Sequence, residues 1–399
     1  MARSRGPWGP RGSGAEDTTA AEALLEDDTA PDSAPPAAES VSQYPCSACG
    51  AILAYRPGER VLHCAFCGAD TPIPQGDPTA LAEAVRERCF ETALAETAQG
   101  AETETTQVAH CDACGAHVEF DPGTHARECP FCATPLVADT TADRHIKPQG
   151  LLPFAIGAAE ARQALAHWLR SRWFAPNGLR RFARTDSRLS GIYTPYWTFD
   201  AETESAYRGR RGDAYTVMVR GPKGRSVAQR RIRWRGASGR VRRSFDDVLV
   251  IGSHSLPQDH AAALAPWDLS QLQPYARDWL AGFRAEAYTV PLDEGFVEAR
   301  NQMDAVIRAD VRRAIGGDQQ QVFSVDTRIS DVTFKHILLP VWVAAYRYRG
   351  RAWRVVINGR TGAVRGERPY SAWKIALAVS LGAAILALVF FLAEGGGFQ

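Results

Sequence analysis

Eight of the nine cysteines in this chain stand in four Cys-x-x-Cys pairs, and this spacing constrains the fold more than any other feature of the sequence. Fourteen residues separate the first pair from the second, and fourteen again separate the third from the fourth. The two stretches align at an offset of 65 residues and also share glycines, a Pro-Gly turn and a phenylalanine beside the last cysteine. The paired cysteines are Cys46, Cys49, Cys64, Cys67, Cys111, Cys114, Cys129 and Cys132. The same small module therefore occurs twice.

The cysteine spacing predicts two structural sites for Zn2+ as cofactor. Each Cys-x-x-Cys turn presents two thiolates, and two turns complete the tetrahedron that zinc prefers, with no open position for a catalytic water. A module of about 25 residues buries too little apolar surface to fold alone, so metal binding would supply much of its folding free energy. Disulfides or an iron site are the alternatives. We expect His63 and His110 at the surface and Cys89 as a half-buried apolar residue.

The C-terminal region carries a second strong pattern. The nineteen residues from Ile375 to Ala393 contain no charge and lie between Lys374 and Glu394. At about 1.5 Å per residue this stretch spans roughly 28 Å, close to the hydrocarbon thickness of a bilayer. Basic residues precede it and a short acidic tail follows, which favours a cytoplasmic location for the N-terminal bulk. We therefore predict a tail-anchored, single-pass protein of the cytoplasmic (inner) membrane; a buried core helix is the alternative.

Composition and pattern also predict where the segments begin and end. Residues 1–43 hold eight acids and three arginines and no apolar run, which is typical of disorder. No secretory signal sequence is recognisable there. The predicted segments are a disordered acidic N-terminus at 1–43, zinc ribbon 1 at 44–74, a helical linker at 75–107, zinc ribbon 2 at 108–138, a duplicated α+β domain at 145–369, a transmembrane helix at 373–393 and a tail at 394–399.

The α+β domain is predicted from a second, weaker duplication. Two helix-like stretches align at an offset of 138 residues, and each is followed by a Pro-x-Trp motif, at Pro195 and at Pro340, that opens an alternating aromatic strand. We expect two units, at about 151–288 and 289–369, each a helix followed by a β-meander. The strand aromatics are expected to be core. The residues expected on the buried helix faces are Leu165, Trp168, Leu169, Met303, Val306 and Ile307.

One segment is strongly basic although the whole chain has a formal net charge of only +1. Residues 207–243 contain thirteen Lys and Arg and one acid, Asp213. Alternation with Ile232 and Trp234 would place a row of guanidinium groups on one strand face, able to bind nucleic acid, anionic lipid or an acidic protein surface. A solvated edge strand protected by its charge is the alternative. The candidate residues are Arg208, Arg210, Arg211, Arg230, Arg231, Arg233, Arg235, Arg240, Arg242 and Arg243.

Three further segments, read with the two ribbons, carry a family resemblance. They are GIYTPYWTFDAETE from Gly191, FDDVLVIGSHSLP from Phe245 and VVINGRTGAVRGERPYSAWKI from Val355. The chain resembles a family of bacterial double zinc-ribbon membrane proteins, some of which carry TFIIB-type zinc-ribbon or primosomal helicase labels. The resemblance implies partners such as flotillin-like and phage-shock-type membrane-stress proteins. It does not imply helicase activity, because the chain lacks a P-loop motif and GPKGRS from Gly221 has neither its spacing nor its ending.

The sequence does not predict an enzyme. It contains no zinc-protease, serine-hydrolase or nucleotide-binding motif. Asp246 and Asp247 are adjacent carboxylates, but neighbouring residues of a strand point to opposite faces, so they make a poor acid–base pair. We therefore expect an adaptor that recruits a cytoplasmic protein partner to the lipid bilayer, with no small-molecule substrate. A nucleic-acid-binding zinc-ribbon protein at the membrane is the alternative.

Overall fold

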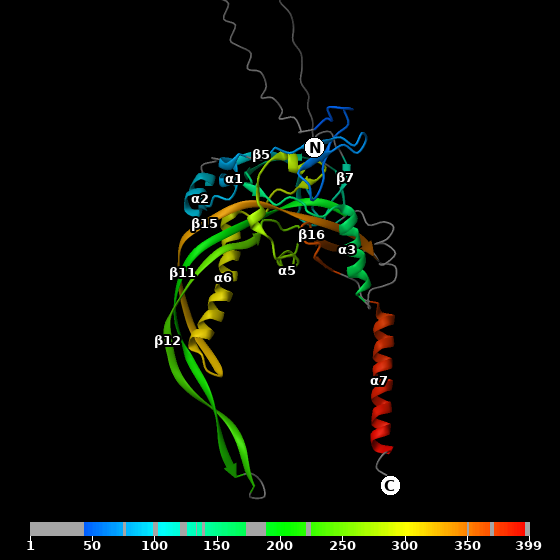
Figure 1. Ribbon diagram of the computed structural model, residues 1–399. Coiled ribbons are helices and arrows are strands. Elements are labelled where there is room, and N and C mark those ends of the chain that lie inside the picture. The colour runs from blue at the N-terminus through cyan, green and yellow to red at the C-terminus, as the bar shows by residue number, and fades with distance from the viewer. Residues whose placement is uncertain are drawn as a thin grey trace, which may run out of the picture. The chain divides into compact units, whose positions relative to one another are not determined.

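Three long strands dominate the chain (Figure 1). In the computed structural model the described residues are 44–74, 77–98, 103–119, 126–132, 134–137, 140–172, 189–220, 225–348, 351–367 and 371–395, so the predicted disordered segment 1–43 lies outside them. The long strands are β11 (Leu189–Arg220), β12 (Ser226–Ile251) and β15 (Gln319–Tyr348). Strand β11 pairs antiparallel with β12 on one side and with β15 on the other. The described part of the chain is therefore built mainly from sheet.

These strands belong to a nine-stranded mixed sheet whose main path runs β12-β11-β15-β10-β13, with β12 at its edge. A β-strand that is buried on both faces reads as a continuous apolar run, and β11 is buried at every position from 192 to 201. Beyond that point buried and exposed residues alternate, because one face is open. The smaller strands of this sheet are β4 (Arg88–Cys89), β10 (Gly150–Leu151), β13 (Gln273–Pro274), β14 (Arg284–Ala285), β16 (Arg351–Asn358) and β17 (Val364–Gly366).

Two helices predicted from the 138-residue repeat are present. Helix α3 (Ala158–Arg170) buries Leu165 and Leu169, and α6 (Leu292–Ile315) lies along β11, β12 and β15 and buries Met303 and Ile307 (Figure 1). The strand aromatics are core as expected, with Trp197 completely buried. Trp168 is only partly buried. The expectation for Val306 is wrong, since it is 36% exposed: the buried residues of α6 from Ala299 onward recur every four positions, a narrow stripe that passes beside it.

The two predicted units do not form separate bodies. Both contribute a helix followed by a long strand, but the long strands β11 and β15 pair with each other inside one sheet. Within that pairing Tyr193 stands opposite Pro340, and Pro195 opposite Leu338. Short additional helices follow β12 before α6 begins; these are α5 (Gln258–Ala262), η2 (Leu269–Gln271) and η3 (Arg277–Leu280).

The two cysteine modules form small sheets of their own. Ribbon 1 (residues 44–74) contains β1 (Ala54–Tyr55) and β2 (Val61–His63), the hairpin expected between its cysteine pairs, and β3 (Asp70–Pro72), which follows the second pair and pairs with β2. Ribbon 2 (residues 108–138) uses β6 (His117–Glu119) paired with β5 (Thr103–His110), and β7 (Ala126–Glu128) paired with β8 (Pro135–Val137); β9 (Thr140–Ile146) also pairs with β5.

The linker between the ribbons is only partly helical. It contains α1 (Pro78–Ala84) and α2 (Phe90–Ala98), but β4 lies between them and pairs with β15. Strand β5 already begins at Thr103, so the predicted helical linker at 75–107 is wrong at its end. The β-branched threonines of TETT favour a strand there.

The ribbons pack on opposite faces of the large sheet. Ribbon 1 shares an apolar cluster with α3 and with Tyr193 and Leu338 of the sheet. Ribbon 2 shares another cluster with Ile192 and Leu339, whose side chains point to the other face. The sheet therefore separates the two cysteine modules.

One helix is long and apolar enough to cross a membrane. Helix α7 (Ala372–Gly395) includes the stretch Trp373–Phe391, with a mean hydropathy of 2.3 and none of that window buried inside the protein. A core helix would bury at least one face, so the alternative of a buried helix is not supported.

Candidate metal centres

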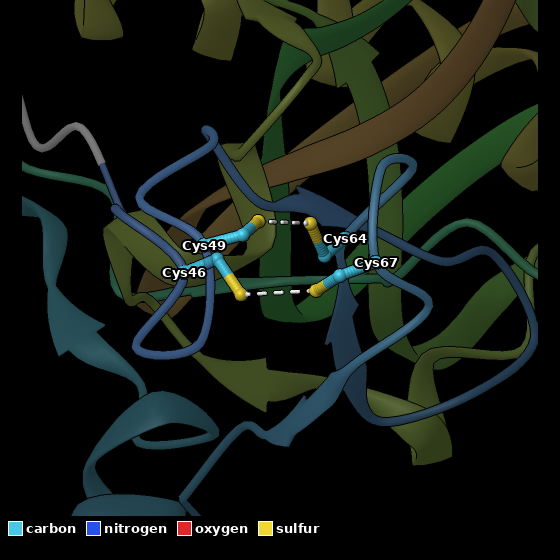
Figure 2. A group of neighbouring side chains, drawn as sticks. All are labelled: Cys46, Cys49, Cys64 and Cys67. Carbon is cyan, nitrogen blue, oxygen red and sulfur yellow. Dashed lines mark hydrogen bonds between the residues drawn. The ribbon is translucent and has the colours of Figure 1, made fainter.

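The four cysteines of ribbon 1 converge on one point. Cys46 and Cys49 come from the loop before β1, and Cys64 and Cys67 come from the loop after β2 (Figure 2). The Sγ atoms of Cys46 and Cys67 lie 3.5 Å apart, as do those of Cys49 and Cys64, and all four sulfurs fall within 4.8 Å of one another.

The backbone of each loop is shaped to present the sulfurs. The residue after the second cysteine is a glycine with positive φ, +76° at Gly50 and +76° at Gly68, a conformation that favours glycine. The Gly50 N–H donates to the Cys46 carbonyl at 2.8 Å and closes the turn. Backbone N–H groups of Cys67 and Phe66 lower the pKa of the Cys64 thiol to about 6. The Ala69 N–H lowers the pKa of Cys67, but the neighbouring sulfurs of Cys64, Cys46 and Cys49 together raise it to about 12.

Ribbon 2 repeats this geometry. Its sulfurs pair at 3.5 Å between Cys111 and Cys132 and at 3.6 Å between Cys114 and Cys129, again all within 4.8 Å. Gly115 takes φ of +73° and its N–H donates to the Cys111 carbonyl at 2.7 Å. The predicted eight cysteines are thus gathered into the two predicted clusters.

The distances fit a bound ion better than disulfides. A disulfide holds its sulfurs about 2.05 Å apart. Four sulfurs at about 2.3 Å from a tetrahedral ion lie about 3.8 Å from one another. The observed spacings of 3.5 and 3.6 Å are close to the tetrahedral value, and all eight thiols are free. Each cluster could therefore hold one metal ion with four sulfur ligands.

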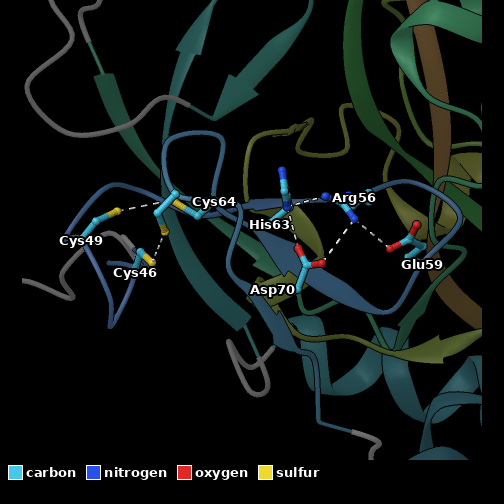
Figure 3. A network of polar contacts seen from close by, with 8 residues as sticks. Cys46, Cys49, Arg56, Glu59, His63, Cys64 and Asp70 are labelled. Atoms are coloured by element: carbon cyan, nitrogen blue, oxygen red, sulfur yellow. Dashed lines mark hydrogen bonds and ion pairs between the residues drawn. The ribbon is translucent and has the colours of Figure 1, made fainter.

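A polar network within ribbon 1 binds the His63 side chain outside the four-cysteine cluster. The His63 Nδ1 lies 2.6 Å from the Asp70 carboxylate, and Arg56 bridges Asp70 at 3.3 Å and Glu59 at 3.2 Å (Figure 3). In ribbon 2 the exposed His110 contacts Asp112 at 3.1 Å. Neither histidine belongs to the four-cysteine clusters, and His63 is half-buried rather than fully at the surface.

The two centres differ in their access to solvent. In ribbon 1, Cys49 and Cys67 are exposed. In ribbon 2, Cys114 is partly buried and Cys132 is buried, together with Cys111 and Cys129. The duplication of the sequence alone did not indicate this difference, because it arises from what packs against each module.

The ten candidate arginines do not share one face. All are exposed, but the register of β11 and β12 divides them between the two faces of this strand pair. One face holds Arg211, Arg231, Arg233, Arg235 and Arg243, and the other holds Arg208, Arg210, Arg230, Arg240 and Arg242. Five have carboxylate partners: Arg211 with Asp213 at 2.8 Å, Arg230 with Asp318 at 3.6 Å, Arg240 and Arg242 with Glu204 at 3.5 and 3.2 Å, and Arg243 with Asp310 at 3.1 Å. The row formed by the three alternating arginines is present; a single basic face formed by all ten is not.

A cluster of charged groups around the buried Lys335 has no marker in the sequence. Its side chain is 7% exposed, and its Nζ lies 3.0 Å from Asp247, 3.5 Å from Glu87 and 3.6 Å from Asp200. Burial raises the pKa of Asp200 to about 6. A β-bulge in β11 and the positive φ of Asp247, +52°, bring these groups together. Only the register of β11, β12 and β15 with the β4 region could reveal the cluster.

The sequence did not indicate the surroundings of two other residues, Cys89 and Glu286. Cys89, expected to be half-buried, is exposed in the short strand β4. Glu286 is completely buried, accepts a 2.5 Å hydrogen bond from Ser253 and borders a cavity of about 30 Å³ that is also lined by Tyr288 and His336. Burial raises the pKa of Glu286 to about 8. A cavity of this size has room for about one water molecule.

Comparison with known proteins gives one similarity. The chain is 28% identical over 264 residues to the uncharacterized protein YdjG of Bacillus subtilis (strain 168), which covers 64% of this chain and 76% of that protein. No family model matches the chain. No solved structure matches it either.

Proposed function

We propose that this protein is a membrane-anchored zinc-ribbon adaptor that recruits a cytoplasmic protein partner to the bilayer. The observation that carries the proposal is the pairing, in one chain, of two four-cysteine clusters with one apolar helix that is not buried. Four-thiolate sites stiffen small modules without leaving an open catalytic position, so they suit a role in binding rather than chemistry.

Zinc is the metal that we assign to both clusters. Four thiolates in tetrahedral array select Zn2+ or iron, and zinc is the usual occupant of structural sites on paired Cys-x-x-Cys turns. Thiolates remain available to metal in a reducing compartment, which agrees with a cytoplasmic location for the ribbons. Basic residues ahead of α7 favour the same orientation.

The internal duplication of the α+β domain is also part of the proposal. The sequence repeat equates Tyr193 with Leu338 and Pro195 with Pro340. The pairing of Tyr193 with Pro340 and of Pro195 with Leu338 is what a local two-fold relation between the copies requires. A duplicated unit that pairs with itself would give a rigid sheet with one ribbon on each face.

Recruitment can be tested with the full-length chain. The tagged protein is extracted from membranes in mild detergent, treated with nuclease and purified, and the proteins that remain bound are identified. We expect one cytoplasmic partner, without a membrane anchor of its own, that sediments with membranes when the full chain is present. With a chain ending before Ala372 the partner should stay in the soluble fraction. If no protein remains bound after nuclease treatment, the adaptor function is wrong.

Nucleic-acid binding at the membrane is the second candidate, favoured by the arginine row on β12. The row of Arg231, Arg233 and Arg235 is exposed on one face, and Arg233 also stacks over Tyr215 with its Cζ 5.0 Å from the ring centroid. Binding through these residues would weaken steeply with salt and fall when all three are changed to glutamine. Salt-independent partner binding that survives the triple substitution would eliminate this candidate.

A further inference from the structure

The second cysteine turn of ribbon 1 presents an unusual apolar surface. This turn, Cys64–Cys67, exposes Ala65 and Cys67, and the side chain of Phe66 between them is 85% exposed. An aromatic ring in this position offers a large apolar area to a binding partner. Because the turn is closed by a backbone hydrogen bond from Gly68 to Cys64 at 3.0 Å, Phe66 is held on a stiff loop.

The duplicated module shows what the same turn does when it is covered. The equivalent residues in ribbon 2 are Pro130, Phe131 and Cys132, and all three are buried, with Phe131 at 0% exposure. Phe131 belongs to an apolar cluster that includes Leu256, Ala261, Leu264 and Trp267. Of these residues only Ala261 lies in the short helix α5, while Leu256, Leu264 and Trp267 lie in the chain on either side of it. This turn therefore shares its core with a short apolar segment, residues 256–267.

We propose that the exposed turn Cys64–Cys67 is the surface that binds the recruited protein, and that it takes a short apolar segment of that protein with Leu, Ala or Trp side chains, the counterpart of residues 256–267 in this chain. The inference rests on the proposed adaptor function and names the surface that performs it. Phe66 is the aromatic anchor of the contact, as Phe131 is inside this chain. Aromatic anchors in rigid settings dominate the binding energy of interfaces.

The charges near ribbon 1 favour a protein over a polyanion. Arg56 is paired with both Glu59 and Asp70, so this network carries one positive and two negative groups (Figure 3). A surface that binds phosphates or anionic headgroups needs unpaired cations around it. The network offers none, and the other arginine of ribbon 1, Arg60, donates to Gln273 and stacks over Trp279. A short apolar segment needs no basic rim.

The contact can be located by photo-crosslinking in the full, membrane-anchored chain. Benzoylphenylalanine is placed at position 66 and, as a matched control, at position 323, where Phe323 is 60% exposed on β15. We expect position 66 to crosslink to one peptide of one protein, with Leu, Ala or Trp residues at the crosslinked site, and position 323 to give no such adduct. A crosslink to lipid, to a second copy of this chain or to residues 1–43 would overturn the proposal.

Binding of the crosslinked peptide then measures the contact. The synthetic peptide is titrated against the zinc-loaded full chain in detergent micelles, and Phe66→Ser should raise its Kd at least tenfold, equivalent to about 1.4 kcal/mol. The Phe323→Ser control should bind like the wild type, and both variants should keep their metal content and unfolding midpoint. If a partner is recruited to membranes equally well by Phe66→Ser, the docking surface is wrong and the adaptor function stands. If nothing is recruited, both are wrong.

Discussion

The two equivalent phenylalanines provide a stringent test, because one substitution in two copies of a module should have opposite consequences for stability. Phe131 is fully buried, and a phenylalanine that leaves a core costs about 3–5 kcal/mol when it is shortened to alanine. Phe66 is 85% exposed, so little of its surface is covered and Phe66→Ala should cost well under about 1 kcal/mol. The free energies of unfolding of the two variants should therefore differ by at least about 2 kcal/mol.

The assay is urea unfolding of the zinc-loaded full-length chain in detergent micelles, followed by tryptophan fluorescence. Phe131→Ala should lower the midpoint at an unchanged slope, while Phe66→Ala should overlay the wild type. Metal content measured on both variants controls for loss of the ion. Equal destabilisation by the two substitutions would refute the packing of ribbon 2 against the α5 segment and the exposure of the equivalent turn in ribbon 1.

Three further predictions follow from buried charge and from the exposure of the centres. Burial raises the pKa of Glu286 to about 8, above its value near 4.5 in the unfolded chain. Its contribution to stability is therefore full below about pH 4.5 and is lost as the pH rises to about 8. Across that window the free energy of unfolding of Glu286→Gln, measured in urea, should rise relative to the wild type by up to about 1.4 kcal/mol per pH unit. Lys335→Met should destabilise by about 2–3 kcal/mol, because it leaves Asp200 and Asp247 without their cation, and Lys335→Arg should destabilise less. A chromogenic chelator should remove metal from ribbon 1 faster than from ribbon 2, since two sulfurs of ribbon 1 are exposed; a single release phase for two equivalents would contradict this.

The metal-binding residues could be predicted from sequence because the information is local. The spacing of Cys46 from Cys49, and of that pair from the next, almost determines that four sulfurs converge, and the glycine after each first turn marks its positive φ. The information that identifies the apolar stretch from Ile375 to Ala393 is equally local, since its length and lack of charge are sufficient to identify α7 as a candidate membrane span.

Features that depend on distant parts of the chain could not be predicted. The ribbons lie on opposite faces because neighbouring residues of β11 and β15 point to opposite sides of the sheet. The pairing register of these two strands shifts by one residue at bulges, and no sequence motif marks those positions. The same register divides the basic segment between two faces and gathers acids around Lys335. Phe66 and Phe131 occupy equivalent positions in the sequence, and only the apolar cluster around Phe131 distinguishes them.

The most direct test of the two metal centres is the metal content of the full-length protein purified from membranes without added metal. We predict two Zn2+ per chain, falling to one when Cys64 and Cys67 are both changed to serine and to one when Cys129 and Cys132 are changed instead. A zinc content well below two per chain, or iron in its place, would contradict the assignment of both clusters as structural zinc sites.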